Sequence, residues 1–220
     1  MDETQIEVNG EGLVLTPAGA AWWPGERTLV LADIHFEKGS AYARGRQFLP
    51  PYDTRTALKR IAALMAHYAP ARVIALGDSF HDADGASRLD EFERETLADL
   101  GGRAEWIWIE GNHDPVLPSW LCGRIVSEIV VGNLRFRHEP SPLRARGEIA
   151  GHLHPCATVT RRGHSIRRRC FVSDGSRLVL PAFGAYAGGL DVREAAIRSL
   201  FGGRVLAYLL GARRVYAAAA

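Results

Sequence analysis

The sequence predicts an α/β fold, and two features of the 220-residue chain indicate it. In the first half, short apolar runs that are typical of buried strands alternate with segments whose apolar residues recur at helical spacing. This alternation indicates parallel strands joined by helical crossovers. The second half changes character, because short strand-like runs follow one another there between turns. The hydrophobic content of 47% is that of an ordinary globular protein.

The elements of the first half follow from these patterns in order. Residues 1–32 alternate apolar runs with Gly and Pro, so they are expected to form a few strands, the last of which ends before Asp33. A loop rich in Gly, Lys and Arg follows. Two helices are then predicted from capping residues, apolar spacing and the Gly pair at 101–102, and each is followed by an apolar run that predicts a strand. One helix is expected from Asp53, as its N-cap, through about Tyr68, and the other over about 89–100. The strands are expected over Arg72–Leu76 and Glu105–Ile109.

The second half is predicted to consist mainly of strands. Residues 125–131 and Leu134–Arg137 are expected to form a hairpin across the two-residue turn Gly132-Asn133. Residues 184–189 are too rich in Gly for regular structure, and residues 217–220 are expected to form a frayed tail. Further strands are predicted near Glu148–Ala150, 157–160, 165–172, 177–180 and 204–210.

Composition limits where the protein works and what it contacts. Three scattered cysteines favour a reducing compartment, and the acidic N-terminus does not resemble a signal peptide. No apolar stretch approaches the roughly 20 residues of a membrane span, so we expect a cytoplasmic protein without membrane association. Residues 1–110 hold 11 Lys and Arg against 18 Asp and Glu, a formal charge of −7, whereas residues 111–220 hold 16 against 7, a formal charge of +9.

Four polar clusters each follow directly after an apolar run, where a predicted strand ends. Ligands gather beyond the carboxyl ends of strands in open α/β sheets, and mixed nitrogen and oxygen donors suit divalent metals. Taken alone, an Asp after a strand is more often a turn former than a ligand. The clusters therefore indicate a metal site through their joint occurrence. They are Asp33-Ile34-His35, Gly77-Asp78, Gly111-Asn112-His113-Asp114 and Gly151-His152-Leu153-His154.

The order of these clusters resembles the motifs of the calcineurin-like metallophosphoesterase superfamily. The motifs are Asp-x-His, Gly-Asp-x-x-His, Gly-Asn-His-Asp, a lone His and Gly-His-x-His. This sequence supplies the second as Gly77-Asp78-Ser79-Phe80-His81 and the lone His as His138. The resemblance spans nearly the whole chain. It implies a single domain over residues 1–220, built as a four-layer α-β-β-α sandwich of two mixed β-sheets flanked by helices.

The resemblance also implies a role for each motif residue. Asp33, His35 and His154 would hold one metal ion, Asn112, His138 and His152 would hold a second, and Asp78 would bridge the two. His81 is expected beside the ligands, or else as an ordinary surface histidine. His113 would stabilise developing charge or protonate the leaving oxygen, and Asp114 is available to orient its ring. Two divalent ions per site are implied, with Mn²⁺ expected first and Fe, Zn or Co as alternatives.

A narrower resemblance lies outside these clusters. Four segments are similar to the ligase-associated DNA-damage-response endonuclease branch, whose members are usually encoded beside an ATP-dependent DNA ligase, a helicase and an exonuclease. The branch implies a metal-dependent endonuclease that hydrolyses phosphodiester bonds in DNA or RNA during DNA repair, in functional association with the ligase and helicase. The segments are His35-Phe36-Glu37-Lys38, Leu49-Pro50-Pro51-Tyr52-Asp53-Thr54, His138-Glu139-Pro140 and Leu180-Pro181-Ala182-Phe183-Gly184-Ala185-Tyr186.

Basic residues near the last motif are candidates for binding the substrate. Lys38 follows the first cluster, and Arg161, Arg162 and Arg167 surround a predicted turn after His154. Such side chains suit a phosphate backbone, although a solvated hairpin face explains them equally well.

Two other functions stay open from the sequence. One is a metallophosphoesterase for a small nucleotide or phosphomonoester, and the other is a non-catalytic scaffold of the same fold. A homo-oligomer is also possible, because Trp22, Trp23 and residues 184–189 would serve a subunit contact as well as a core.

Overall fold

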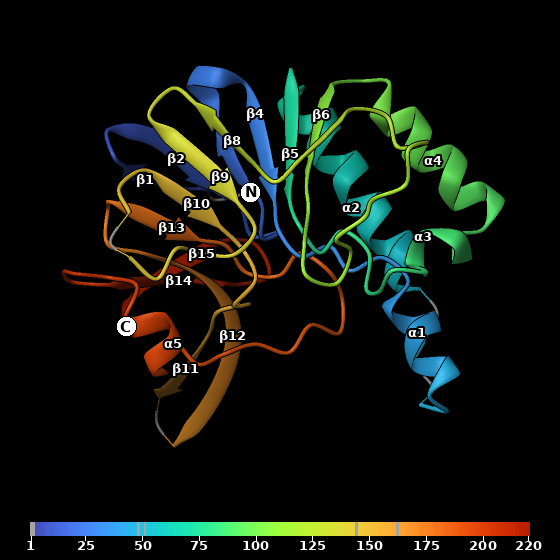
Figure 1. Cartoon of the computed structure of the whole chain (residues 1–220). Coiled ribbons are helices and arrows are strands. Elements are labelled where there is room, and N and C mark those ends of the chain that lie inside the picture. Colours follow the sequence, from blue (N-terminus) through green and yellow to red (C-terminus); the bar gives the residue numbers. More distant parts are fainter. Residues whose placement is uncertain (1–2, 48, 51, 144, 162) are drawn as a thin grey trace.

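Two mixed β-sheets pack face to face in the computed structural model, which describes residues 3–47, 49–50, 52–143, 145–161 and 163–220 (Figure 1). The first sheet has the order β1-β2-β3-β4-β5-β6-β7. Its strands are β1 (Thr4–Val8), β2 (Glu11–Leu15), β3 (Ala21–Trp23), β4 (Thr28–Leu31), β5 (Arg72–Leu76), β6 (Glu105–Ile109) and β7 (Arg124–Val126). Strands β4 to β7 run parallel, whereas β1 to β4 form an antiparallel meander.

The second sheet has the order β15-β14-β12-β13-β10-β9-β8, with β11 paired to β12 alone among the described strands. Its strands β9, β10 and β13 are parallel neighbours, and the other pairings are antiparallel. The strands are β8 (Glu128–Val131), β9 (Leu134–Arg137), β10 (Glu148–Ala150), β11 (Cys156–Arg161), β12 (His164–Ser173), β13 (Arg177–Val179), β14 (Leu206–Leu210) and β15 (Val215–Ala219).

Helices cover the outer faces of both sheets, so the molecule has four layers. Buried residues of α2 (Asp53–Tyr68) and α4 (Glu91–Gly101) pack on one face of the first sheet, among them Leu58, Ile61 and Leu97. Apolar residues of both sheets fill the space between them. On the outer face of the second sheet, the four-residue helix α5 (Ala195–Arg198) and its flanks form a thinner layer. The predicted four-layer sandwich is confirmed.

Local sequence explains the two long helices. In α2, the apolar residues at helical spacing are buried, and the helix ends where Ala69 adopts a left-handed φ of 45° before Pro70. Helix α4 begins with a capping box between Asp90 and Glu93, two residues later than the pattern predicts. Two short helices, α1 (Lys38–Arg44) and α3 (Gly85–Arg88), complete this layer.

Three local expectations are wrong. The predicted loop after His35 contains α1, which is fixed to α2 where Glu37 N–H donates to Thr54 Oγ1 and the Thr54 hydroxyl donates to the Glu37 carboxylate. The predicted strand 125–131 is two strands, because the chain leaves the first sheet after β7 and enters the second at β8. Residues 217–220 do not form a frayed tail, since β15 pairs with β14 along its whole length.

The charge asymmetry of the sequence follows the two sheets. The first sheet and its helices end with β7, and residues 1–127 hold 12 Lys and Arg against 19 Asp and Glu, a formal charge of −7. Residues 128–220, which form the second sheet and its covering layer, hold 15 against 6, a formal charge of +9. Folding therefore keeps the acidic and basic parts of the chain in separate layers. Among the described residues, no helix is both long enough and apolar enough to cross a bilayer.

Candidate metal centre

The polar clusters meet because parallel strands of both sheets end at the same place. Asp33, Asp78 and Asn112 follow β4, β5 and β6 of the first sheet, which are parallel neighbours. His138 and the Gly151–His154 cluster follow β9 and β10 of the second sheet, which are also parallel neighbours. Five strands of the two packed sheets thus end side by side. Ligand sites in α/β sheets lie beyond the carboxyl ends of such strands.

One group of donor atoms is formed by Asp33, His35, Asp78 and His154, whose ligand atoms all lie within 4.8 Å of one another. The Nε2 atoms of His35 and His154 are 3.2 Å apart. His154 Nε2 lies 3.4 Å from Asp33 Oδ1, and His35 Nε2 lies 3.9 Å from Asp78 Oδ2. Two imidazoles and two carboxylates therefore face one small volume, which is a donor set that divalent metals accept.

A second group shares Asp78 with the first. It contains His138 and His152, again with ligand atoms within 4.8 Å of one another. His138 Nε2 lies 3.4 Å from Asp78 Oδ1 and 3.2 Å from His152 Nδ1. The side-chain oxygen of Asn112 is 2.8 Å from the same His138 nitrogen. The two groups meet at one carboxylate, whose two oxygens face different groups.

Burial keeps the imidazoles in the form that binds metals. Asp33, His35 and Asp78 are at most 2% exposed. Burial, together with the neighbouring His154 and Lys38, lowers the pKa of His35 from 6.5 to about 2. Burial and the neighbouring His138 also lower the pKa of His152. Both rings are therefore neutral at pH 7 and present a lone pair, which metal coordination requires.

Backbone hydrogen bonds orient the donor side chains. His152 N–H donates to both carboxylate oxygens of Asp33, at 3.1 and 2.9 Å. The Nδ1 atom of His138 lies 2.8 Å from the carbonyl oxygen of Leu76, an acceptor, so Nδ1 carries the proton. The other nitrogen, Nε2, therefore points its lone pair at Asp78 and the second donor group.

The ligand loops are held in a conformation that side chains disfavour. Asp33, His35, Asp78, His152 and His154 all have φ values between 46° and 69°. A left-handed residue other than Gly costs about 1–3 kcal/mol, so the surrounding contacts must enforce it. Part of this enforcement is strand-like pairing that continues past β4 and β5: the N–H groups of residues 35 and 36 donate to the carbonyls of residues 78 and 79, at 2.9 and 2.8 Å.

His113 lies outside both donor groups but faces their shared carboxylate. Its Nε2 is 3.9 Å from Asp78 Oδ2, and 43% of its side chain is exposed. Its Nδ1 lies 2.8 Å from the carbonyl oxygen of His81, and the two rings stack with centroids 5.3 Å apart. The backbone and ring of His81 thus hold His113 at the solvent side of the centre, and His81 itself is in neither donor group.

The expected contact of Asp114 with the His113 ring is not what the structure contains. Asp114 Oδ2 accepts the Phe80 N–H at 2.9 Å, and Oδ1 accepts the Gly111 N–H at 3.2 Å. Its pKa is raised from 3.8 to about 6, mainly by burial. Asp114 therefore joins the turns after β5 and β6, and the carbonyl of His81 takes the role that the sequence suggested for Asp114.

The predicted substrate-binding residues are placed differently from one another. Lys38 begins α1 and is buried, with Nζ 5.8 Å from the centre of the Tyr42 ring. Arg167 is exposed on β12, and its guanidinium donates to Gly189 O at 2.5 Å. The backbone of Arg161 lies in β11, its side chain is outside the described part of the chain, and Arg162 is outside the described residues altogether.

Sequence reasoning missed Tyr42 near the centre. Its ring lies 5.7 Å from that of His81, and it sits on α1, a helix that the loop-like composition of residues 36–51 concealed. A prediction of the helix Lys38–Arg44 would have placed Tyr42 beside the residues that follow β4.

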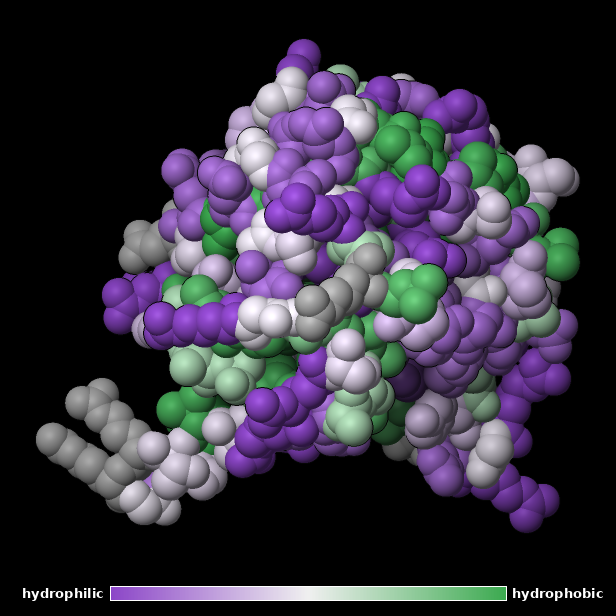
Figure 2. All heavy atoms as spheres, turned by 60° about the vertical axis from the view of Figure 1, so that its left-hand side comes forward, coloured by the Kyte–Doolittle hydropathy of each residue, from purple (hydrophilic) through white to green (hydrophobic). Residues whose placement is uncertain are grey.

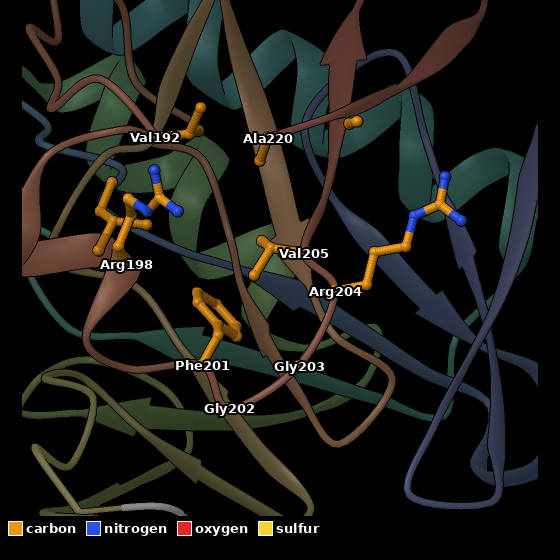
Figure 3. Close-up of a pocket in the computed structure, with 10 residues that line it drawn as sticks. Val192, Arg198, Phe201, Gly202, Gly203, Arg204, Val205 and Ala220 are labelled. Carbon is orange, nitrogen blue, oxygen red and sulfur yellow. The ribbon is translucent and has the colours of Figure 1, made fainter.

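A cavity of about 300 Å³ lies elsewhere, on the outer face of the second sheet (Figure 3). Val192, Ile197, Phe201 and Val205 contribute apolar walls, and Arg198 and Arg204 contribute charge. None of the predicted metal or catalytic residues lines it. The candidate site is instead the open convergence of strand ends described above.

The chain is similar to known phosphoesterases and to a nuclease. Residues 26–174 match the family described as Calcineurin-like phosphoesterase. The crystal structure of the nuclease MPE from Pseudomonas putida superposes with a TM-score of 0.76 at 29% sequence identity, covering 98% of this chain and 100% of that one. Yfce, a phosphoesterase from E. coli, covers 87% of this chain and 98% of its own at 14% identity and a TM-score of 0.44. No curated protein sequence matches the chain.

Proposed function

The chain belongs to the calcineurin-like phosphoesterase family, and from this premise we propose that it is a metal-dependent endonuclease that hydrolyses phosphodiester bonds in DNA or RNA. One observation carries the proposal: two groups of buried donor atoms share the single carboxylate of Asp78. A shared carboxylate between two donor groups is what a binuclear hydrolytic centre needs, because it holds two cations close to each other.

The residues present fit two divalent ions. Asp33, His35 and His154 would hold one, Asn112, His138 and His152 the other, and Asp78 both. The fit rests on the donors themselves: ring nitrogens lie 3.2 Å apart in each group, and His35 and His152 are neutral at pH 7. When bound, such ions polarise phosphoryl oxygens and make water acidic enough to be a nucleophile near neutral pH. The absence of thiolates disfavours a metal that only thiolates select. Mn²⁺ is the first candidate because the resembled family commonly uses it, with Fe, Zn or Co as alternatives, since affinity order alone would not select Mn²⁺.

His113 is the proposed proton donor to the leaving oxygen. Because the carbonyl of His81 fixes the proton on Nδ1, the neutral ring has its lone pair on Nε2, which faces Asp78 and solvent. A second proton on Nε2 gives an imidazolium whose N–H points at the centre. This N–H can stabilise negative charge or be transferred to the departing alkoxide. Asp114 contributes by fixing the turn that carries His113.

Nucleic acid is the proposed substrate class because the similar structure over 98% of the chain is that of a nuclease. The four segments of this chain that resemble the ligase-associated DNA-damage-response endonuclease branch support the same choice. From the resemblance to this branch we further propose a role in DNA repair, in functional association with an ATP-dependent DNA ligase and a helicase, and from the scattered cysteines a cytoplasmic location. Lys38, the first residue of α1, follows the loop after β4 and is a candidate contact for a substrate phosphate.

The test compares substrates with the purified protein and Mn²⁺. We expect hydrolysis of bis(p-nitrophenyl) phosphate and cleavage of circular single-stranded DNA or RNA, because only an endonuclease opens a circle. Hydrolysis of p-nitrophenyl phosphate alone would contradict the nuclease proposal and favour a phosphomonoesterase. The Asp78→Asn variant, purified in the same way, is the control for a contaminating nuclease.

A further inference from the structure

The β11–β12 hairpin leaves the second sheet and stands clear of the body of the molecule (Figures 1 and 2). Residues 156–161 pair with residues 164–169, whereas the rest of β12, from Cys170 to Ser173, pairs with β14 and β13 inside the sheet. At about 3.3 Å per residue, the six paired residues span roughly 20 Å, and the base of this span is buried at Cys156 and Ala157. Residues 156–170 contain five Arg and no Asp or Glu.

The two faces of the hairpin differ in chemistry. Side chains alternate along a strand, and residues paired in register share a face. On the face that we call the inner face, the pairs are Cys156 with Arg169, Thr158 with Arg167, and Thr160 with Ser165. On the opposite face, the pairs are Ala157 with Arg168, Val159 with Ile166, and Arg161 with His164, and Val159 and Ile166 are exposed. The inner face is thus polar throughout its exposed part.

Contacts at its base show that the inner face points toward the metal centre. Arg169 Nη1 donates to Ala182 O at 2.7 Å and to Gly184 O at 2.8 Å, and the Gly184 N–H in turn donates to Asp33 O at 3.1 Å. Arg169 therefore serves to fix the base of the hairpin to residues 182–184. Arg167, one step farther out, donates to Gly189 O.

The Gly189 segment connects Arg167 with the ligand His154. Leu190, next to Gly189, accepts the Cys156 N–H at 2.8 Å and donates to Leu153 O at 3.4 Å, on either side of His154. Arg167 is exposed, and it is connected to the proposed metal ligand His154 through the backbone of residues 189 and 190. Asp191, the acid at the base of the hairpin, has its own partner in Arg193 at 2.7 Å.

We propose that the inner face of the β11–β12 hairpin is a phosphate-backbone subsite, which holds a nucleic-acid strand as it leaves the metal centre. This inference rests on the proposed function and adds a second binding region to it. A guanidinium has five N–H donors, so the contact of Arg167 with Gly189 O leaves donors for a phosphate. The hydroxyls of Thr160 and Ser165, 2.7 Å apart, supply further donors of the kind that position nucleic-acid backbones.

The test uses two neighbouring arginines on opposite faces. Arg167→Gln removes the charge but keeps an amide N–H for Gly189 O, and Arg168→Gln is the matched control on the other face. For cleavage of a long single-stranded DNA, Arg167→Gln should reduce the slope of log kcat/KM against log salt by about 0.7. The factor by which kcat/KM falls below that of wild type should then be about 2.6-fold larger at roughly 50 mM salt than at roughly 200 mM. Its kcat/KM for long DNA should fall relative to that for bis(p-nitrophenyl) phosphate.

A second variant avoids the Gly189 contact. Thr160→Val with Ser165→Ala should raise KM for long DNA without changing the salt slope, because no charge is removed. An equal effect of Arg167→Gln and Arg168→Gln would overturn the assignment to the inner face. Unchanged salt slopes in both arginine variants would overturn the subsite itself, as would a hairpin that proves, by sedimentation, to join two copies of the chain.

Failure of the proposed function has a different signature. If wild type cleaves no DNA or RNA at any salt concentration, the endonuclease proposal is wrong. Fluorescence anisotropy of labelled single-stranded DNA with the full-length protein then tests the subsite separately. Weaker binding by Arg167→Gln than by Arg168→Gln would support it, and equal binding would reject it.

Discussion

The backbone N–H of His113 donates a hydrogen bond of 2.9 Å to Oδ1 of Asp78, the carboxylate that both donor groups share. Asp114 adds a second connection, because it accepts the Phe80 N–H. The turns after β5 and β6 therefore form one unit, in which the proposed proton donor is placed by the proposed bridging ligand. Substitutions can separate these two roles.

Replacement of Asp78 by Asn tests the bridging role. The amide oxygen can still accept the His113 N–H, so the fold should persist, but the negative charge between the two donor groups is lost. We expect kcat/KM for bis(p-nitrophenyl) phosphate to fall by at least about 10²-fold and the bound metal per chain to decrease. Asp99→Asn, at an exposed ion pair on α4, is the control and should retain both. Full activity with a normal metal content in Asp78→Asn would remove Asp78 from the centre.

Replacement of His113 by Ala tests proton donation without removing a ligand. We expect kcat to fall by about 10²–10⁴-fold while the metal content measured by elemental analysis is unchanged. The loss should be larger for DNA than for bis(p-nitrophenyl) phosphate, because an alkoxide needs a proton more than p-nitrophenolate does. His67→Ala, at the exposed end of α2, should have wild-type kcat. Equal losses on both substrates would argue for charge stabilisation without proton transfer.

Removal of metal tests whether the donor groups bind ions that stabilise the fold. Ligand at about 100 times its Kd stabilises a protein by about 2.7 kcal/mol, which for a chain of this size raises Tm by about 5–10 °C. Differential scanning calorimetry of chelator-treated protein with and without Mn²⁺ should show this increase. In the Asp78→Asn variant the increase should be smaller. An identical increase in the two proteins would mean that the stabilising ion binds elsewhere.

Replacement of Gly77 by Ala tests how closely the loop after β5 of the first sheet approaches His138 of the second. The φ of Gly77 is +75°, and a Cβ there would lie 2.5 Å from the ring of His138. Gly77→Ala should therefore lower both stability and metal affinity. Gly175→Ala is a matched control, since Gly175 has a φ of +84° but open space around its Cβ position, and it should cost only the backbone strain of about 1–2 kcal/mol. Urea unfolding and metal titration measure the two effects. Equal behaviour of the two variants would show that the ring of His138 moves aside freely.

Glu93 tests the pH dependence of stability. Burial raises its pKa, and the nearby Glu37 adds to this increase. A carboxyl whose folded pKa exceeds the unfolded value of about 4.3 binds more protons in the folded state, so stability falls as pH rises through that interval. Gln can still accept the Asp90 N–H of the capping box. The urea midpoint of Glu93→Gln should therefore gain on that of wild type as pH rises from about 4, and a constant difference would contradict the raised pKa.

The fold was predictable where local pattern and tertiary pairing agree. Helix α2 ends where predicted because apolar spacing and Pro70 indicate the same limit, but it begins at Asp53 with Tyr52 as its N-cap, whereas Asp53 was the predicted N-cap. The break between β7 and β8 was not predicted, because Ser127 and Glu128 interrupt the apolar run of residues 125–131 only briefly, and it is the partner β6 that draws Arg124–Val126 into the first sheet. Strand β15 has an alanine-rich sequence that favours no strand, and its pairing with β14 makes it one.

The candidate site followed from sequence in its residue types but not in its supporting contacts. Ligand motifs are contiguous in the chain, so their presence after strand ends was visible. The partner of the His113 ring was not visible, because the His81 carbonyl is a backbone group that any residue supplies. Arg169 is indistinguishable in sequence from its neighbours Arg167 and Arg168. Alternation along β12 separates it from Arg168, and its place at the base of the hairpin brings it, and not Arg167, to the carbonyls of residues 182 and 184.

The separation of charge between the two sheets gives the molecule an electric dipole directed across the sandwich, from the −7 half toward the +9 half. In the field of a polyanion, a torque acts on such a dipole before any contact forms. A molecule with this dipole turns its second sheet and the β11–β12 hairpin toward a polyanion during diffusion, so encounters in that orientation become more frequent than random orientation allows. Added salt shortens the range of this torque to about 8 Å at physiological ionic strength, so the association rate should decrease with salt even where the contacts themselves are unchanged.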